Sequence, residues 1–214
     1  SGQLSFPWPR SMAQVRGELV RMAGMALLTL NNTMETFQKN NPKALKKWHL
    51  YEQHIDAMQR AITIHLTQIF QGDVNPAEAK ELSGMMRITN NIERIGDSVE
   101  NIALIFEDIL DDRITFSDRA LSDINTISRE ATAFLIMIKD AIQKKPPYFW
   151  RDAQILENNI DIMREEMRDA HIERLQKGAC SNQAGLMFSD ILSNFEKIGD
   201  YCYNIAQAIE GIKY

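Results

Sequence analysis

The sequence contains few of the residues that interrupt helices or cross-link chains. Its 214 residues include 6 prolines, 10 glycines and 2 cysteines. The prolines fall outside the segments with helical periodicity or, at Pro76, at the start of one, so the composition favours helix over nearly the whole chain. Cys180 and Cys202 have neither the spacing of metal ligands nor that of a redox pair, and we interpret them as free thiols in a reducing compartment.

Long apolar runs and an excess of positive charge are also missing. The longest apolar run, residues 131–138, contains Thr132 and is far shorter than the ~18 residues of a membrane span. The formal net charge is −5, whereas a nucleic-acid partner requires a basic face, so we expect no nucleic-acid binding. Hydrophobic residues make up 44% of the chain, which is enough for one substantial globular domain.

The sequence has no signature of nucleotide or hydrolytic chemistry. It contains no Gly-rich phosphate loop and no Ser or Cys nucleophile beside a His. Di-iron carboxylate oxidases need Glu-x-x-His motifs on two helices of a four-helix bundle, and this sequence has no such motif. We therefore expect that the protein is not an enzyme.

Hydrophobic periodicity predicts six long helices. Apolar residues recur at steps of three and four, as from Val15 to Phe37, and Pro, Gly or a polar stretch marks each break. Residues 1–11, in which Pro7 and Pro9 oppose regular helix, are predicted to be a tag remnant and a linker. The predicted helices span residues 12–39, 43–71, 76–110, 117–144, 150–177 and 182–212.

Two motifs of the sequence occur twice. Residues 91–103 read NIERIGDSVENIA, and residues 194–206 read NFEKIGDYCYNIA. In a shorter pair, residues 51–58 read YEQHIDAM and residues 156–163 read LENNIDIM. Each half of the chain therefore carries one copy of each motif, on two successive predicted helices.

The repeats predict the fold. Three predicted helices fall in each half, and three helices of this length leave one face uncovered unless the halves pack together. We therefore expect an all-α fold of two tandem three-helix bundles, related by pseudo-two-fold symmetry and forming one domain. The first repeat would span residues 12–111 and the second residues 117–214. Gly96 and Gly199, in the middle of the longer motif, predict a close helix–helix approach.

Every copy of either motif places a Glu and an Asp four residues apart, on one face of a helix. Like charges at this spacing destabilise a helix slightly, so their repetition favours cation binding over a purely structural role. Oxygen ligands suit Mg and Mn and tolerate Fe and Zn, so we expect divalent or transition metal ions of this group. The eight candidate metal ligands are Glu52, Asp56, Glu93, Asp97, Glu157, Asp161, Glu196 and Asp200.

Other interpretations of the acidic motifs stay open. A metal-free helical interaction scaffold and a di-metal carboxylate enzyme with a helical bundle are both compatible with the pattern. His54 lies between two of the acids but faces elsewhere on a helix, and none of the four histidines has ligand spacing. The acids could instead form a solvated face or pair with basic residues such as Arg16, Arg21, Arg94, Arg129 and Lys197.

The longer motif resembles the signature of the PhoU family, through residues 93–97 (ERIGD) and 196–200 (EKIGD) and the companion acids of the shorter motif. The resemblance covers about residues 12–212. It implies two three-helix bundles whose acidic motifs bind multinuclear iron or zinc clusters. It also implies a cytoplasmic regulator of phosphate transport and signalling, placed at the inner face of the cell membrane. Its partners would be a phosphate transporter and a sensor kinase, and homodimer formation is left open.

The first predicted helix has a narrower resemblance. Residues 15–23 (VRGELVRMA) are similar to the PhoU-like C-terminal domain of sodium/phosphate cotransporter family proteins. No Met precedes Met12, and the Pro-broken, aromatic residues 4–10 suit a connection. We therefore expect the tail of a membrane transporter, whose membrane-embedded part would be the partner. A free-standing PhoU homologue is the alternative.

Overall fold

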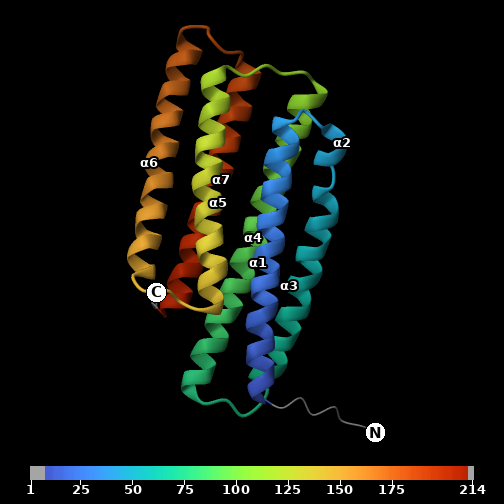
Figure 1. The fold of residues 1–214 in the computed structure, drawn as a ribbon, viewed down its shortest axis with the longest axis vertical. Coiled ribbons are helices and arrows are strands. Elements are labelled where there is room, and N and C mark those ends of the chain that lie inside the picture. Colours follow the sequence, from blue (N-terminus) through green and yellow to red (C-terminus); the bar gives the residue numbers. More distant parts are fainter. Residues whose placement is uncertain (1–7, 212–214) are drawn as a thin grey trace.

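The computed structural model describes residues 8–211, and all regular structure in this range is helical (Figure 1). Six long helices run roughly along the long axis of the molecule, and one short helix joins two of them. In chain order the helices are α1 Trp8–Gln38, α2 Pro42–Leu45, α3 Trp48–Phe70, α4 Pro76–Asp111, α5 Asp118–Gln143, α6 Phe149–Gln176 and α7 Asn182–Glu210.

Each repeat contributes three long helices, α1, α3 and α4 from the first and α5, α6 and α7 from the second. Contacts of α4 with α7 and of α1 with α5 join the two units into one body. One cluster of buried hydrophobic residues runs through both units and includes Phe106 and Phe195. The all-α fold of two three-helix bundles predicted from the sequence is confirmed. Within residues 8–211, no helix is both long and apolar enough to cross a membrane.

Side-chain caps explain where several helices begin. The Asn75 side chain accepts a hydrogen bond from the Glu78 backbone N–H, and the Glu78 side chain accepts one from the Asn75 N–H, at the start of α4. The Ser117 and Ser181 side chains each accept one hydrogen bond, from the backbone N–H of Ala120 and of Ala184, at the starts of α5 and α7. Because Asn and Ser are preferred N-cap residues, the sequence itself indicates where these helices begin.

The first helix begins earlier than the sequence predicts. Residues 8–11, predicted as part of a linker, belong to α1, which starts at Trp8. Pro9 lies in the first turn of α1, where a backbone N–H has no intrahelical acceptor, so the missing donor does not interrupt the helix. The rest of the predicted linker, residues 1–7, lies outside the described residues.

The single helix predicted over residues 43–71 is wrong. A turn after Leu45 divides it into α2 and α3. The Lys47 backbone N–H donates to the Ala44 carbonyl oxygen at 3.3 Å, which is the tighter winding of a 3₁₀ turn. This turn places both Leu45 and Trp48 in the core, with exposed fractions of 0% and 3%.

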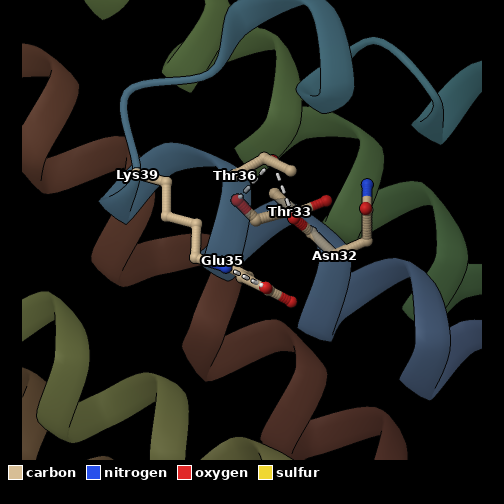
Figure 2. A network of polar contacts seen from close by, with 5 residues as sticks. All are labelled: Asn32, Thr33, Glu35, Thr36 and Lys39. Carbon is tan, nitrogen blue, oxygen red and sulfur yellow. Dashed lines mark hydrogen bonds and ion pairs between the residues drawn. The ribbon is translucent and has the colours of Figure 1, made fainter.

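Polar side chains near the C-terminal end of α1 bond within their own helix (Figure 2). The Thr36 hydroxyl donates to the backbone oxygen of Asn32 at 2.7 Å. Lys39 forms an ion pair with Glu35, one turn earlier in the chain. The Thr36 hydroxyl, on a buried residue, therefore needs no partner from another helix.

Two reciprocal asparagine pairs join α4 to α7. Asn204 Nδ2 donates to Asn91 Oδ1 at 3.0 Å, and Asn101 Nδ2 donates to Asn194 Oδ1 at 3.2 Å. Asn91 and Asn194 occupy the first position of the longer motif, and Asn101 and Asn204 occupy its eleventh. Each pair therefore joins the first position of one repeat to the eleventh position of the other, as pseudo-two-fold symmetry requires.

Candidate metal centre

A glycine on α4 and another on α7 bring the acid-bearing helices together. The acids of the first repeat lie on α3 and α4, and those of the second lie on α6 and α7. A Cβ atom on Gly96 would lie 3.4 Å from the Ile55 side chain, and one on Gly199 would lie 3.1 Å from Ile160. These contacts confirm the close approach predicted from the glycines, and they place the acids of neighbouring helices beside one another.

In the first repeat, oxygen atoms of Glu52, Asp97 and Glu100 all lie within 4.8 Å of one another. Asp56 adjoins this group through a hydrogen bond with Glu52, and Glu93 interacts electrostatically with Asp97 and Asp56. We call these five residues the first cluster. Its three close oxygens could serve as ligands of one hard cation.

Three glutamates of the first cluster have raised pKa values. The hydrogen bond to Asp56, together with burial, raises the pKa of Glu52 to about 7. Burial and the charge of Asp97 raise the pKa of Glu93 to about 7. The same two causes raise the pKa of Glu100. Negative charge concentrated in this way is relieved either by a proton or by a bound cation.

In the second repeat, oxygen atoms of Glu157, Asp161 and Asp200 lie within 4.8 Å of one another. Burial and a hydrogen bond with Asp161 raise the pKa of Glu157 to about 7. Burial and the charge of Glu196 raise the pKa of Asp200 to about 6. We call Glu157, Asp161, Glu196 and Asp200 the second cluster.

Two sequence differences make the clusters unequal. Glu100 of the first cluster corresponds in the repeat to Tyr203, which has no carboxylate. In the second cluster, Arg164 Nε lies 3.0 Å from Glu196 Oε2, and the matching position of the first repeat is Gln59. The second cluster thus has one carboxylate fewer, and its Glu196 is held in an ion pair, whereas Arg94 acts on Glu93 of the first cluster only through its charge. The first cluster is therefore the better match to a divalent cation.

Only some of the eight predicted metal ligands lie close enough together to share one ion. Five of the eight belong to the two groups of close oxygens, and Glu100 completes the first group. Asp56 and Glu93 contact the first group without belonging to it, and Glu196 is held in the ion pair with Arg164. Charge pairing, one of the alternatives from the sequence, thus applies to Glu196.

Sequence reasoning missed both Glu100 and Arg164 because neither is repeated. Glu100 follows Asp97 by three residues, a spacing that places both on one side of α4 and could have identified it. Among the basic residues considered as partners, Arg16 pairs with Glu81, which belongs to neither cluster.

The family model described as the PhoU domain matches residues 19–106 and 124–209. The chain belongs to the PhoU family. One matched PhoU segment falls in each repeat. A Thermotoga maritima protein named phosphate-specific transport system accessory protein PhoU homolog 1 is 22% identical, over 94% of this chain and 86% of its own length.

Solved PhoU structures have the same fold. PhoU from Pseudomonas aeruginosa superimposes with a TM-score of 0.88 at 16% identity, covering 95% of this chain and 97% of that chain. The phosphate transport system regulatory protein PhoU from Streptococcus pneumoniae gives 0.83 at 15% identity, covering 95% of both chains. At these identities the likeness establishes the PhoU fold alone.

Replacing Gly199 by Ala is expected to lower the free energy of unfolding of this PhoU protein by about 1–2 kcal/mol. The new Cβ would lie 3.1 and 3.2 Å from atoms of Ile160, whose β-branched side chain turns poorly within a helix. Gly96→Ala is the matched control, because its Cβ would lie at an ordinary contact distance of 3.4 Å from Ile55. In Gly96→Ala the better helix propensity of Ala should dominate and raise the free energy of unfolding by up to about 1 kcal/mol. Urea unfolding measures both variants, and equal losses would contradict the tighter packing at Gly199.

Proposed function

We propose that this chain regulates phosphate transport as a PhoU protein whose two acidic clusters bind divalent or transition metal ions. The main support is the convergence, in each repeat, of three carboxylate oxygens within 4.8 Å. Magnesium, manganese, iron and zinc all accept oxygen ligands, so this donor set fits any of them. A bound ion would neutralise the clustered charge and would link α3 to α4, or α6 to α7.

The role in phosphate transport is supported by the family and by the names of two relatives. The Thermotoga protein is named as an accessory protein of phosphate-specific transport, and the Streptococcus protein as a regulatory protein of the phosphate transport system. In our proposal the domain acts in the cytoplasm, at the inner face of the membrane, on a phosphate transporter. Signalling through a sensor kinase would follow from the same interaction.

The domain could be tethered to the transporter that it regulates. In this version of the proposal, it is the tail of a sodium/phosphate cotransporter family protein, and the membrane-embedded part precedes it in the same chain. Tethering would raise the effective concentration of the domain at its partner to about the millimolar range. Regulation would then require that two states of the transporter bind the domain with different affinities.

Metal ions are expected to stabilise the fold. An ion that binds only the folded chain adds about 2.7 kcal/mol at a hundredfold excess over its Kd. For a chain of this size, that corresponds to a rise in Tm of about 5–10 °C. Melting should be measured after treatment with a chelator and again with Mn, Fe, Zn or Mg added back. If none of these ions raises the Tm, the metal part of the proposal is wrong.

Elemental analysis of protein purified without added metal would identify the resident ion. The same preparation, given oxygen and a reductant, tests for the activity expected of a carboxylate oxidase. Turnover would favour a metalloenzyme over a regulator. Metal content without turnover would support the proposal.

A further inference from the structure

A small polar cavity lies at one end of the second repeat. None of its lining residues belongs to either acidic cluster. Its volume is about 30 Å³, and its lining includes the first residues of α5, the last turns of α6 and the first turn of α7. In Figure 1, the connections from α4 to α5 and from α6 to α7 lie at the same end of the bundle. His171, Arg174 and Cys180 are the lining residues with titratable side chains.

Two nitrogen atoms in the lining are buried and have no hydrogen-bond partner. They are Nε2 of His171, a residue with an exposed fraction of 3%, and Nη2 of Arg174. Arg174 forms no ion pair with any other residue in the range 8–211. Its guanidinium packs against Phe188, 5.5 Å from the centroid of the ring. A buried donor without an acceptor costs about 1–3 kcal/mol, and more when it is charged.

The first repeat shows that the fold does not need these polar groups. The positions equivalent to His171 and Arg174 are Leu66 and Ile69, which are buried hydrophobic residues of α3. On the facing helix, Gly185 replaces a buried Leu, and a Cβ there would lie 3.2 Å from the His171 ring. The second repeat therefore has polar side chains and a cavity where the first repeat has buried hydrophobic residues, and Gly185 leaves room for the imidazole.

The electrostatic surroundings of the cavity favour a negative charge. The N-termini of α5 and α7 both border it, and a helix N-terminus carries partial positive charge. Two backbone N–H groups of these termini, those of Ala120 and Ala184, already donate to Ser117 and Ser181. Arg174 adds a full positive charge and offsets the opposite end of α6. Burial and the charge of Arg174 lower the pKa of His171, and a hydrogen bond with the Gly185 backbone opposes part of this shift. Asp118, an acid in the first turn of α5, is exposed.

We infer that this cavity is a binding site for a small inorganic anion, held by Arg174 and His171 in the positive field of the N-termini of α5 and α7. A cavity must offer about 10–15 Å³ to hold one water molecule. This cavity offers about 30 Å³, which is enough for an anion larger than a single water. Phosphate, nitrate and halides share the required chemistry, which is a compact negative charge with several acceptor sites. The site is independent of the proposed metal clusters.

Melting experiments test the inference in solution. Sodium phosphate, nitrate or bromide would replace sodium gluconate at constant ionic strength, with metal-free wild-type protein. A bound anion at ten times its Kd should raise the Tm by about 3–6 °C, and the rise should saturate. In the double variant His171→Leu, Arg174→Ile, which copies the first repeat, this rise should disappear. Arg129→Ile is the control, because it removes one positive charge from an exposed position of α5 and should keep the full rise.

Crystals of the wild-type protein grown in sodium bromide provide a second measurement that needs no variant. A bromide peak in anomalous scattering within the cavity, beside Arg174 Nη2, would support the site even if the double variant failed to fold. Water alone in the cavity, with Tm shifts that are equal in the wild type and the folded double variant, would overturn the inference. In that case the two nitrogen atoms are satisfied by buried solvent.

Discussion

Changing Glu52 to Gln and Asp97 to Asn is expected to remove about half of the metal bound per chain. Amide oxygens keep the shape of the site but carry no net charge, so they hold a divalent cation weakly. The pair Glu157→Gln and Asp200→Asn should remove the other half. Without metal, both variants should melt higher than the wild type, because fewer like charges repel one another. Elemental analysis and melting with chelator measure the two effects.

A matched control for these variants is Asp111→Asn with Asp112→Asn, two exposed acids at the C-terminal end of α4. The control changes the net charge by the same amount and should keep its full metal content. If a folded cluster variant also kept all of its metal, its acids would be ordinary surface charges. Because the first cluster has Glu100 and the second has Arg164, metal should leave the second cluster first during titration with a chelator.

Metal-free protein is expected to become less stable as the pH rises from about 4.5 to about 7. Glu52, Glu93 and Glu157 have pKa values raised to about 7, and that of Asp200 is raised to about 6. These four groups therefore bind more protons in the folded chain than in the unfolded chain, so stability falls with pH. The lowered pKa of His171 acts in the opposite direction, but it is a single group. Since these groups are partly exposed, we expect a total loss of roughly 1–3 kcal/mol after solvent screening.

Urea unfolding at several pH values, with chelator present, measures this loss. The two cluster variants described above should each flatten the dependence, because an amide does not titrate. Added metal should reverse the trend, since deprotonated carboxylates bind the ion more tightly. Stability that was constant or rising over this range would contradict the raised pKa values.

The fold was predictable because its helices follow simple local rules. The stripe from Val15 to Phe37 is buried as the period of α1 requires, and Asn75 with Pro76 starts α4 as the sequence indicates. The break after Leu45 was not predictable, because no Gly or Pro marks it. Leu45 and Trp48, on either side of the break, are both buried, and this tertiary packing is not visible in the local sequence.

The positions of the clustered acids were predictable only where the two repeats agree, and their role as metal ligands stays a prediction. Comparison of the repeats identified the acids that both halves share, and it could not identify Glu100 or Arg164, which occur in one half. His171 lacked ligand spacing in the sequence, yet it follows Met167 by one turn on the buried face of α6. His171 lies on a hydrophobic stripe, and the equivalent position of the first repeat is a leucine. This difference between the repeats was the signal that could have identified the polar cavity.

The asparagine pairs between α4 and α7 have the pattern of an isologous interface, in which residue i meets j while j meets i. Two identical subunits related by a two-fold axis form contacts of this kind, and here the two repeats of one chain form them. The register of α4 against α7 is therefore specified twice by side chains of the interface itself. Residues 112–117, which connect the repeats, keep the two halves at high local concentration, while the asparagines determine how the halves align.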